Sequence, residues 1–136
     1  MKYRFIDHTA DIAFEVFGSS LAELIENATL AFYDAFTFLD QLENGRVEEL
    51  EIQSDSPDYL LFKWLNELLF LFDTKFFAAK EVHVEVDEEK FLAKGVLKGG
   101  TIRPEIVKTE PKAITFHEFK VEKREDGWYA FVIVDI

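Results

Sequence analysis

The chain has 136 residues, a length that suits one folded domain, and 49% of its residues are hydrophobic, which indicates a packed core. Fifteen Lys and Arg stand against 27 Asp and Glu, and the formal net charge of −12 argues against direct binding to the phosphate backbone of a nucleic acid. Cysteine is absent, which excludes disulfides, thiolate zinc sites and a cysteine nucleophile.

The acidic residues are unevenly distributed. Residues 1–60 hold 13 Asp and Glu against 3 Lys and Arg, so we expect any cation-binding site in this half of the chain. The sequence shows neither a cationic, apolar leader nor an uncharged apolar stretch of about 18 residues. We therefore expect a cytoplasmic protein without membrane association.

The first 60 residues predict strands and one helix. A short extended start at 3–5 precedes alternating apolar and polar residues that predict a strand over 12–18. Ser20 and Glu23 have the spacing of a capping box, and apolar residues then recur at helical spacing to about Phe38, which predicts a helix over 21–38. Asn44-Gly45 marks a turn into a short strand over 47–52.

A second helix is predicted to start at Ser56-Pro57, because proline is well tolerated at the first helical position. Between residues 60 and 72 this helix is apolar almost all round, and its only polar stripe is made by Lys63, Asn66 and Glu67. Phe70 falls on the same stripe. Either a loop covers Phe70, or Phe70 is an exposed aromatic anchor for a partner protein.

The last third of the chain is predicted to be mainly strands. Alternation from Val82 onward, a turn near Glu88-Glu89 and a second apolar run to Leu97 predict a hairpin. Gly99-Gly100 is interpreted as part of an irregular connection. Two further strands, over 114–121 and 128–136, flank a turn at 125–127, and the last strand is apolar on both faces, which predicts a central position in a sheet.

Two strand ends carry the residues with the clearest metal-binding chemistry. Asp135 follows a run of apolar residues, and an ionised carboxylate at the end of a buried strand would need a partner. The α-carboxylate of Ile136 would add a second hard oxygen donor, which suits Ca²⁺ or Mg²⁺. If the strand ends adjoin, Asp11 joins this site, and His8 and Asp7 are near enough in sequence to bind the ion or to orient its ligands. The alternative is that these groups are solvated or cap turns.

Lys112 and His117 form a second pair of interest. They lie on opposite faces of an ideal strand unless Lys112 belongs to the turn after Pro111. Histidine could act as a base or metal ligand and lysine could bind phosphate, but both also suit a solvated strand surface.

Four separated segments together resemble the archease family. They are Asp7-His8-Thr9-Ala10-Asp11-Ile12, the stretch from Leu60 to Thr74, Lys112-Ala113-Ile114-Thr115-Phe116-His117, and the closing Val134-Asp135-Ile136. The resemblance spans the chain in order. Ala13 departs from it, because the family more often has glycine there, but Ala13 lies outside the expected ligands.

The resemblance implies an α+β fold, in which a mixed or antiparallel sheet packs with two main helices in a single domain over residues 1–136. It implies an accessory protein, not an enzyme, that promotes guanylylation and multiple turnover of an RtcB-type tRNA-splicing RNA ligase. It also implies a divalent metal ion, Ca²⁺ before Mg²⁺, at Asp11, Asp135 and Ile136 with His8 beside them. Lys112 and His117 lie in a matching segment without an assigned role. Some family members are described as modulators or chaperones of a tRNA methyltransferase.

Two rival functions remain at this point. In the first, the same carboxylates hold a metal ion that activates water in a stand-alone hydrolase, with His8 or His117 as the base. In the second, the chain is a general chaperone of RNA-modifying enzymes that uses an exposed apolar stripe around Phe70.

Overall fold

The computed structural model describes all of residues 1–136 and contains two α-helices and seven strands. The elements are β1 (Tyr3–Ile6), β2 (Asp11–Gly18), α1 (Leu21–Phe36), η1 (Leu39–Gln41), β3 (Arg46–Gln53), α2 (Pro57–Lys75), β4 (Phe77–Asp87), β5 (Leu92–Thr101), η2 (Pro104–Ile106), β6 (Ala113–Arg124) and β7 (Gly127–Asp135). The predicted α+β class is confirmed.

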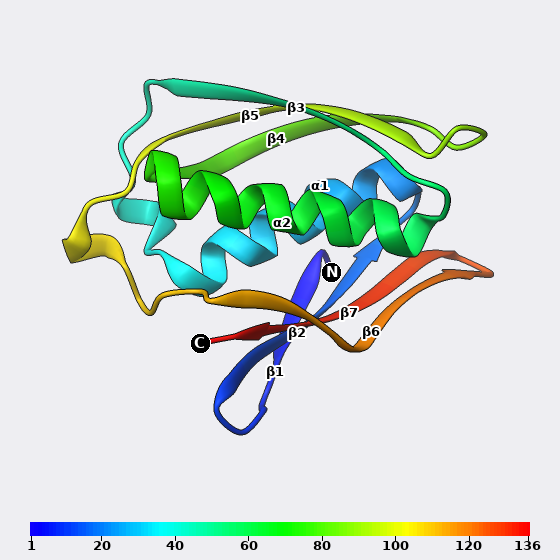
Figure 1. Ribbon diagram of the computed structural model, residues 1–136, viewed down its shortest axis with the longest axis horizontal. Coiled ribbons are helices and arrows are strands. Elements are labelled where there is room, and N and C mark those ends of the chain that lie inside the picture. The colour runs from blue at the N-terminus through cyan, green and yellow to red at the C-terminus, as the bar shows by residue number, and fades with distance from the viewer.

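The strands form two sheets, and α1 and α2 lie between them (Figure 1). One sheet has the order β1-β2-β7-β6 and the other the order β3-β5-β4, and every strand pair is antiparallel. The expectation of one mixed or antiparallel sheet is therefore corrected to two antiparallel sheets. β7 lies between β2 and β6, which confirms the predicted central position of the last strand.

Both helices begin as the sequence predicts. The Ser20 side chain accepts a hydrogen bond from the Glu23 amide, while the Glu23 carboxylate accepts one from the Ser19 amide, so one amide of the first turn and one just before the helix are satisfied. α1 ends at Phe36, two residues earlier than predicted, because Thr37 is extended and bridges to Val107. Neither helix combines the length and apolar character needed to span a membrane.

The helices and the inner faces of both sheets share one cluster of 33 buried hydrophobic residues. Two buried hydrogen bonds join the helices inside it. The Trp64 indole N–H donates to the Thr29 hydroxyl at 2.9 Å, and the Tyr33 hydroxyl donates to the Leu68 carbonyl at 3.2 Å. Every buried side-chain polar atom has a hydrogen-bond partner. The packing of α2 against α1 therefore carries no desolvation penalty from an unsatisfied polar group.

The interpretation of Gly99-Gly100 as an irregular connection is wrong. Both glycines continue β5, where Gly99 pairs with Ala79 and Arg46. A Cβ at Gly99 would lie 1.9 Å from the Ala78 carbonyl oxygen, and one at Gly100 would lie 1.6 Å from that of Glu43. The glycines thus serve close approach of backbones within a strand and do not form a turn.

Candidate metal and docking site

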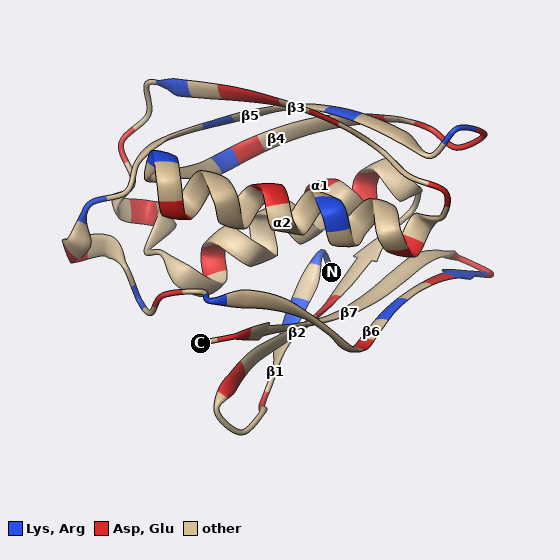
Figure 2. Ribbon diagram, viewed as in Figure 1, with Lys and Arg blue, Asp and Glu red and all other residues tan.

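Asp11 and Asp135 lie directly opposite each other in the sheet. β2 begins at Asp11 and β7 ends at Asp135, and because the two strands are antiparallel these residues are register partners. Paired residues project to the same face, with Cα atoms about 4.5–5.5 Å apart. Phe14 and Val16 point into the core, so alternation places Asp11 on the opposite, outer face of the sheet. Figure 2 shows acidic segments at both strand ends.

The electrostatic cost of this pair differs from the one expected. Asp135 is exposed, so desolvation at the end of a buried strand is not what calls for a partner. Instead, two carboxylates face each other across adjacent strands, and like charges in that arrangement repel. Neither Asp11 nor Asp135 has a Lys or Arg nitrogen within 4.0 Å. A cation between them would therefore remove a repulsion that the chain itself leaves in place.

Glu15, two pairs along the same outer face of β2, provides an internal comparison. It accepts hydrogen bonds from the Tyr129 hydroxyl at 2.6 Å and from the Arg4 guanidinium at 2.9 Å. The Tyr129 hydrogen bond, followed by the Arg4 contacts, lowers the pKa of Glu15 below its ordinary value. One carboxylate of this face is thus neutralised by the protein, whereas the pair at the strand ends is not.

His8 lies beside the pair, and Asp7 lies close to it. The His8 Nδ1 atom is 3.4 Å from Oδ2 of Asp11, so the imidazole can orient one oxygen of that carboxylate while the other stays free. Asp7, His8 and Asp11 line one cavity of about 310 Å³, which Asp34 and Lys108 close on the side of α1. Asp7 makes no hydrogen bond or ion pair within this group.

Glu118 joins the two histidines, and the sequence did not single it out. Its Oε2 atom is 3.9 Å from Nε2 of His8 and 3.9 Å from Nε2 of His117. The β6–β7 pairing is interrupted here, since residues 116–119 of β6 face a single residue of β7. Glu118 has φ of 57° in this interruption. In the sequence, this interruption could have been inferred only from the loss of apolar–polar alternation between Phe116 and Phe119.

The same interruption changes the interpretation of Lys112 and His117. Lys112 precedes β6, as expected, and its amide donates to the Asp135 carbonyl at 2.8 Å, which ties this segment to the candidate site. His117 lies inside the interruption, so the argument from an ideal strand about opposite faces does not apply to it. Both side chains are exposed.

The oxygen donors at the strand ends are of the type that a hard divalent cation prefers. Their number is smaller than such a cation usually requires. Two carboxylates on one face offer the oxygen ligands that Ca²⁺ and Mg²⁺ prefer. No group of three or more His, Asp or Glu side chains is arranged to hold an ion by itself. A further protein donor would come from outside that set of side chains, for example from a main-chain oxygen, and Ile136 follows Asp135 directly.

Phe70 is 52% exposed, so the first of the two alternatives, a covering loop, is wrong, while its role as a partner contact stays a prediction. Other exposed aromatic side chains lie towards the start of α2. Tyr59 is also 52% exposed, and its ring stacks on Phe116 of β6 at a centroid distance of 5.3 Å. Phe70 and Tyr59 therefore each leave about half of their surface open to solvent, although the Tyr59 ring also packs on Phe116.

Comparison with known proteins gives one consistent result. The model of the Archease protein family matches residues 3–136. An archease of Archaeoglobus fulgidus is 58% identical over the full length of both chains, and one of Methanosarcina acetivorans is 35% identical over 99% of this chain and 96% of its own. A solution structure from Methanobacterium thermoautotrophicum is 33% identical with a TM-score of 0.83, and covers 98% of both chains. A Thermotoga maritima archease, 24% identical over 96% of this chain and 94% of its own, shares the fold with a TM-score of 0.70.

Proposed function

Because this chain belongs to the archease family, we propose that it is an accessory protein that activates an RtcB-type tRNA-splicing RNA ligase. In this role it promotes guanylylation of the ligase and multiple turnover, acts in the cytoplasm and catalyses no reaction by itself. The observation that carries the proposal is the unneutralised pair of Asp11 and Asp135 on the outer face of the sheet.

The pair is proposed to hold a divalent cation, Ca²⁺ before Mg²⁺. The two strand ends, with Asp135 exposed and Asp11 half-buried, supply ligands of adaptable geometry, which Ca²⁺ tolerates better than Mg²⁺ does. A main-chain oxygen of Ile136 is the proposed third protein donor, and His8 holds Asp11 through its contact at 3.4 Å. When bound, the ion would supply open coordination positions for a phosphate oxygen.

The net charge of −12 supports docking against a basic surface, such as the nucleotide-binding cleft that a ligase of RNA needs. Complementary charge raises the rate of encounter more than the final affinity, and the effect is screened by salt. Association should therefore slow as ionic strength rises.

The test is guanylylation of the ligase in the presence of Ca²⁺ and this protein. Asp11→Asn, Asp135→Asn and a chain extended by one residue after Ile136 should each reduce the stimulation about tenfold or more, which is the usual cost of removing a metal ligand or its support. Glu49→Gln is the matched control, because Glu49 is an exposed strand carboxylate without an ion pair on the other sheet. Undiminished stimulation by all three variants would refute the proposal.

A second candidate function rests on the exposed aromatic side chains of α2. With Phe70 exposed, the chain could serve as a chaperone or modulator of a tRNA-modifying enzyme such as a methyltransferase. The Thermotoga maritima relative is described as a possible chaperone. Phe70→Glu should abolish binding of such a partner, whereas Lys63→Glu, on the same exposed stripe, should not. This function would replace the first if Phe70→Glu were damaging and the aspartate variants were silent.

A further inference from the structure

A groove of about 770 Å³ lies between the C-terminal end of α2 and the segment that contains η2. Phe72, Ile102 and Val107 contribute apolar surface to it, and Phe76 and Glu110 are also among its lining residues. Its size is within the range of grooves that hold small ligands or side chains. The groove is separate from the cavity beside Asp11, with Lys108 as the one residue that lines both.

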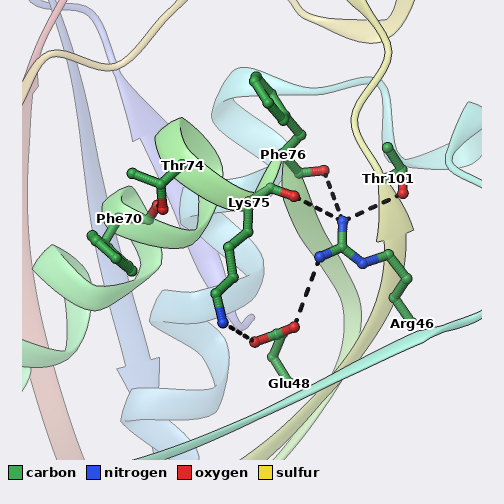
Figure 3. Close-up of polar contacts among 7 residues, drawn as sticks. All are labelled: Arg46, Glu48, Phe70, Thr74, Lys75, Phe76 and Thr101. Atoms are coloured by element: carbon green, nitrogen blue, oxygen red, sulfur yellow. Dashed lines mark hydrogen bonds and ion pairs between the residues drawn. The ribbon is translucent and has the colours of Figure 1, made fainter.

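Phe76 occupies a backbone position that suits glycine. It caps α2 with φ 51° and ψ 44°, the left-handed region in which most helices place Gly or Asn. The conformation is held firmly, since the Phe76 amide donates to the Leu71 carbonyl and the Ile102 amide donates to the Phe76 carbonyl at 2.6 Å. Arg46 donates to the Lys75 and Phe76 carbonyls from the side away from the Phe76 ring (Figure 3).

The ring of Phe76 is not explained by packing, because the residue is 59% exposed. The left-handed backbone conformation of Phe76 destabilises the fold, and the exposed ring adds no core packing that would offset this. Such residues are concentrated at binding sites. The ring is therefore a candidate contact for something outside this chain.

Two carboxylates in the groove, those of Asp73 and Glu110, have no cationic partner within 4.0 Å. Burial raises the pKa of Asp73, and the nearby charge of Glu110 raises it further. The cations close to the groove are already engaged elsewhere. Lys75 Nζ is 3.3 Å from Glu48, and Lys108 Nζ donates to the Asp34 carbonyl at 2.9 Å.

We propose that this groove binds an arginine side chain presented by an extended segment of a partner protein. A guanidinium group stacks on an aromatic face and binds carboxylates through paired hydrogen bonds, and lysine does neither as well. Phe76 supplies the face, Asp73 and Glu110 supply the carboxylates, and the apolar floor accepts neighbouring side chains of the segment. The inference does not depend on the proposed ligase or on the cation at Asp11.

The test is a titration of the ¹⁵N-labelled protein, followed by amide chemical shifts, with the peptide acetyl-Gly-Leu-Arg-Leu-Gly-amide. Saturable shifts are expected at residues 72–76 and 102–110. The peptide with Gln in place of Arg should bind at least about tenfold more weakly, because it lacks both the cation–π and the ion-pair contacts.

Variants separate the groove from the rest of the surface. Phe76→Gly keeps the backbone conformation and removes the ring, and it should weaken the arginine peptide about fivefold or more. Asp73→Asn combined with Glu110→Gln should abolish saturation, while Tyr59→Ala, at the other end of α2, should change nothing. Equal binding of both peptides, full affinity of Phe76→Gly, or shifts of the same amides by Ca²⁺ alone would each overturn the proposal.

Discussion

Asp11→Asn should stabilise the protein without divalent cations and destabilise it with them. The two carboxylates are register partners at the surface, so a separation of about 5 Å in a water-like medium applies, and their repulsion is about 0.8 kcal/mol. Removing one charge should raise the free energy of unfolding by about that amount in EDTA. For a chain of this size, Tm should rise by about 3 °C.

The sign should reverse in Ca²⁺, because the proposed cation site exists only in the folded wild-type protein. At a Ca²⁺ concentration 100 times its dissociation constant, the wild type gains about 2.7 kcal/mol, and a variant that does not bind gains nothing. Asp11→Asn should then be less stable than the wild type by about 2 kcal/mol.

Urea denaturation followed by circular dichroism, in EDTA and in millimolar Ca²⁺, measures both differences for one pair of proteins. Glu49→Gln serves as the control and should show no difference between the two conditions, because Glu49 faces no other carboxylate in its register. The reasoning would be refuted if Ca²⁺ did not change the stability of the wild type and Asp11→Asn were less stable than the wild type in EDTA.

Three further predictions concern stability. Gly99→Ala should lower the free energy of unfolding by about 3 kcal/mol in urea denaturation, because its Cβ would lie 1.9 Å from the Ala78 carbonyl oxygen, and a near-neutral effect would contradict the strand assignment. Phe76→Gly should raise the unfolding free energy by about 1 kcal/mol by relieving the left-handed conformation, and a large loss would show that the ring is structural. The hydrogen bond from Tyr129 lowers the pKa of Glu15, so ionised Glu15 stabilises the fold above the ordinary pKa of 4.5 and this contribution is lost as pH falls through the lowered value. Glu15→Gln should therefore flatten the fall of Tm as pH decreases below 4.5, and an unchanged slope would contradict it.

Local patterns in the sequence predict most elements, whereas the pairing of Asp11 with Asp135 was expected only if the two strand ends adjoin. The capping residues of both helices and the alternation of β2 and β7 depend on neighbours within a few positions, so they can be read without the fold. The proximity of Asp11 and Asp135 follows once the last strand is central and antiparallel to the first long one. The metal-site interpretation of that proximity stays a prediction.

Features that depend on contacts far apart in the chain could not be predicted. Gly99 resembles a turn residue, and only the position of β4 beside it explains the need for a missing side chain. Glu118 meets His8 only because β6 departs from regular pairing next to the β1–β2 loop. The division into two sheets, with the helices between them, likewise requires knowledge of which strands pair.

Two pairs of neighbouring carboxylates in this chain have no Lys or Arg partner within 4.0 Å. Arg4, Lys75 and Lys108 each pair with a carboxylate, whereas Asp11 with Asp135 and Asp73 with Glu110 have no Lys or Arg partner. Strand register brings the first pair together, and the end of α2 and the segment after η2 bring the second pair to one groove. We propose that each pair takes a cation from outside the chain, and the two proposed cations differ in chemistry. The strand ends present hard oxygens that suit a metal ion, while the groove adds an aromatic face that suits a guanidinium group. A single partner could supply a ligand to the metal ion and an arginine to the groove. Once one contact formed, the other would form at a high effective concentration, so the overall affinity would rise.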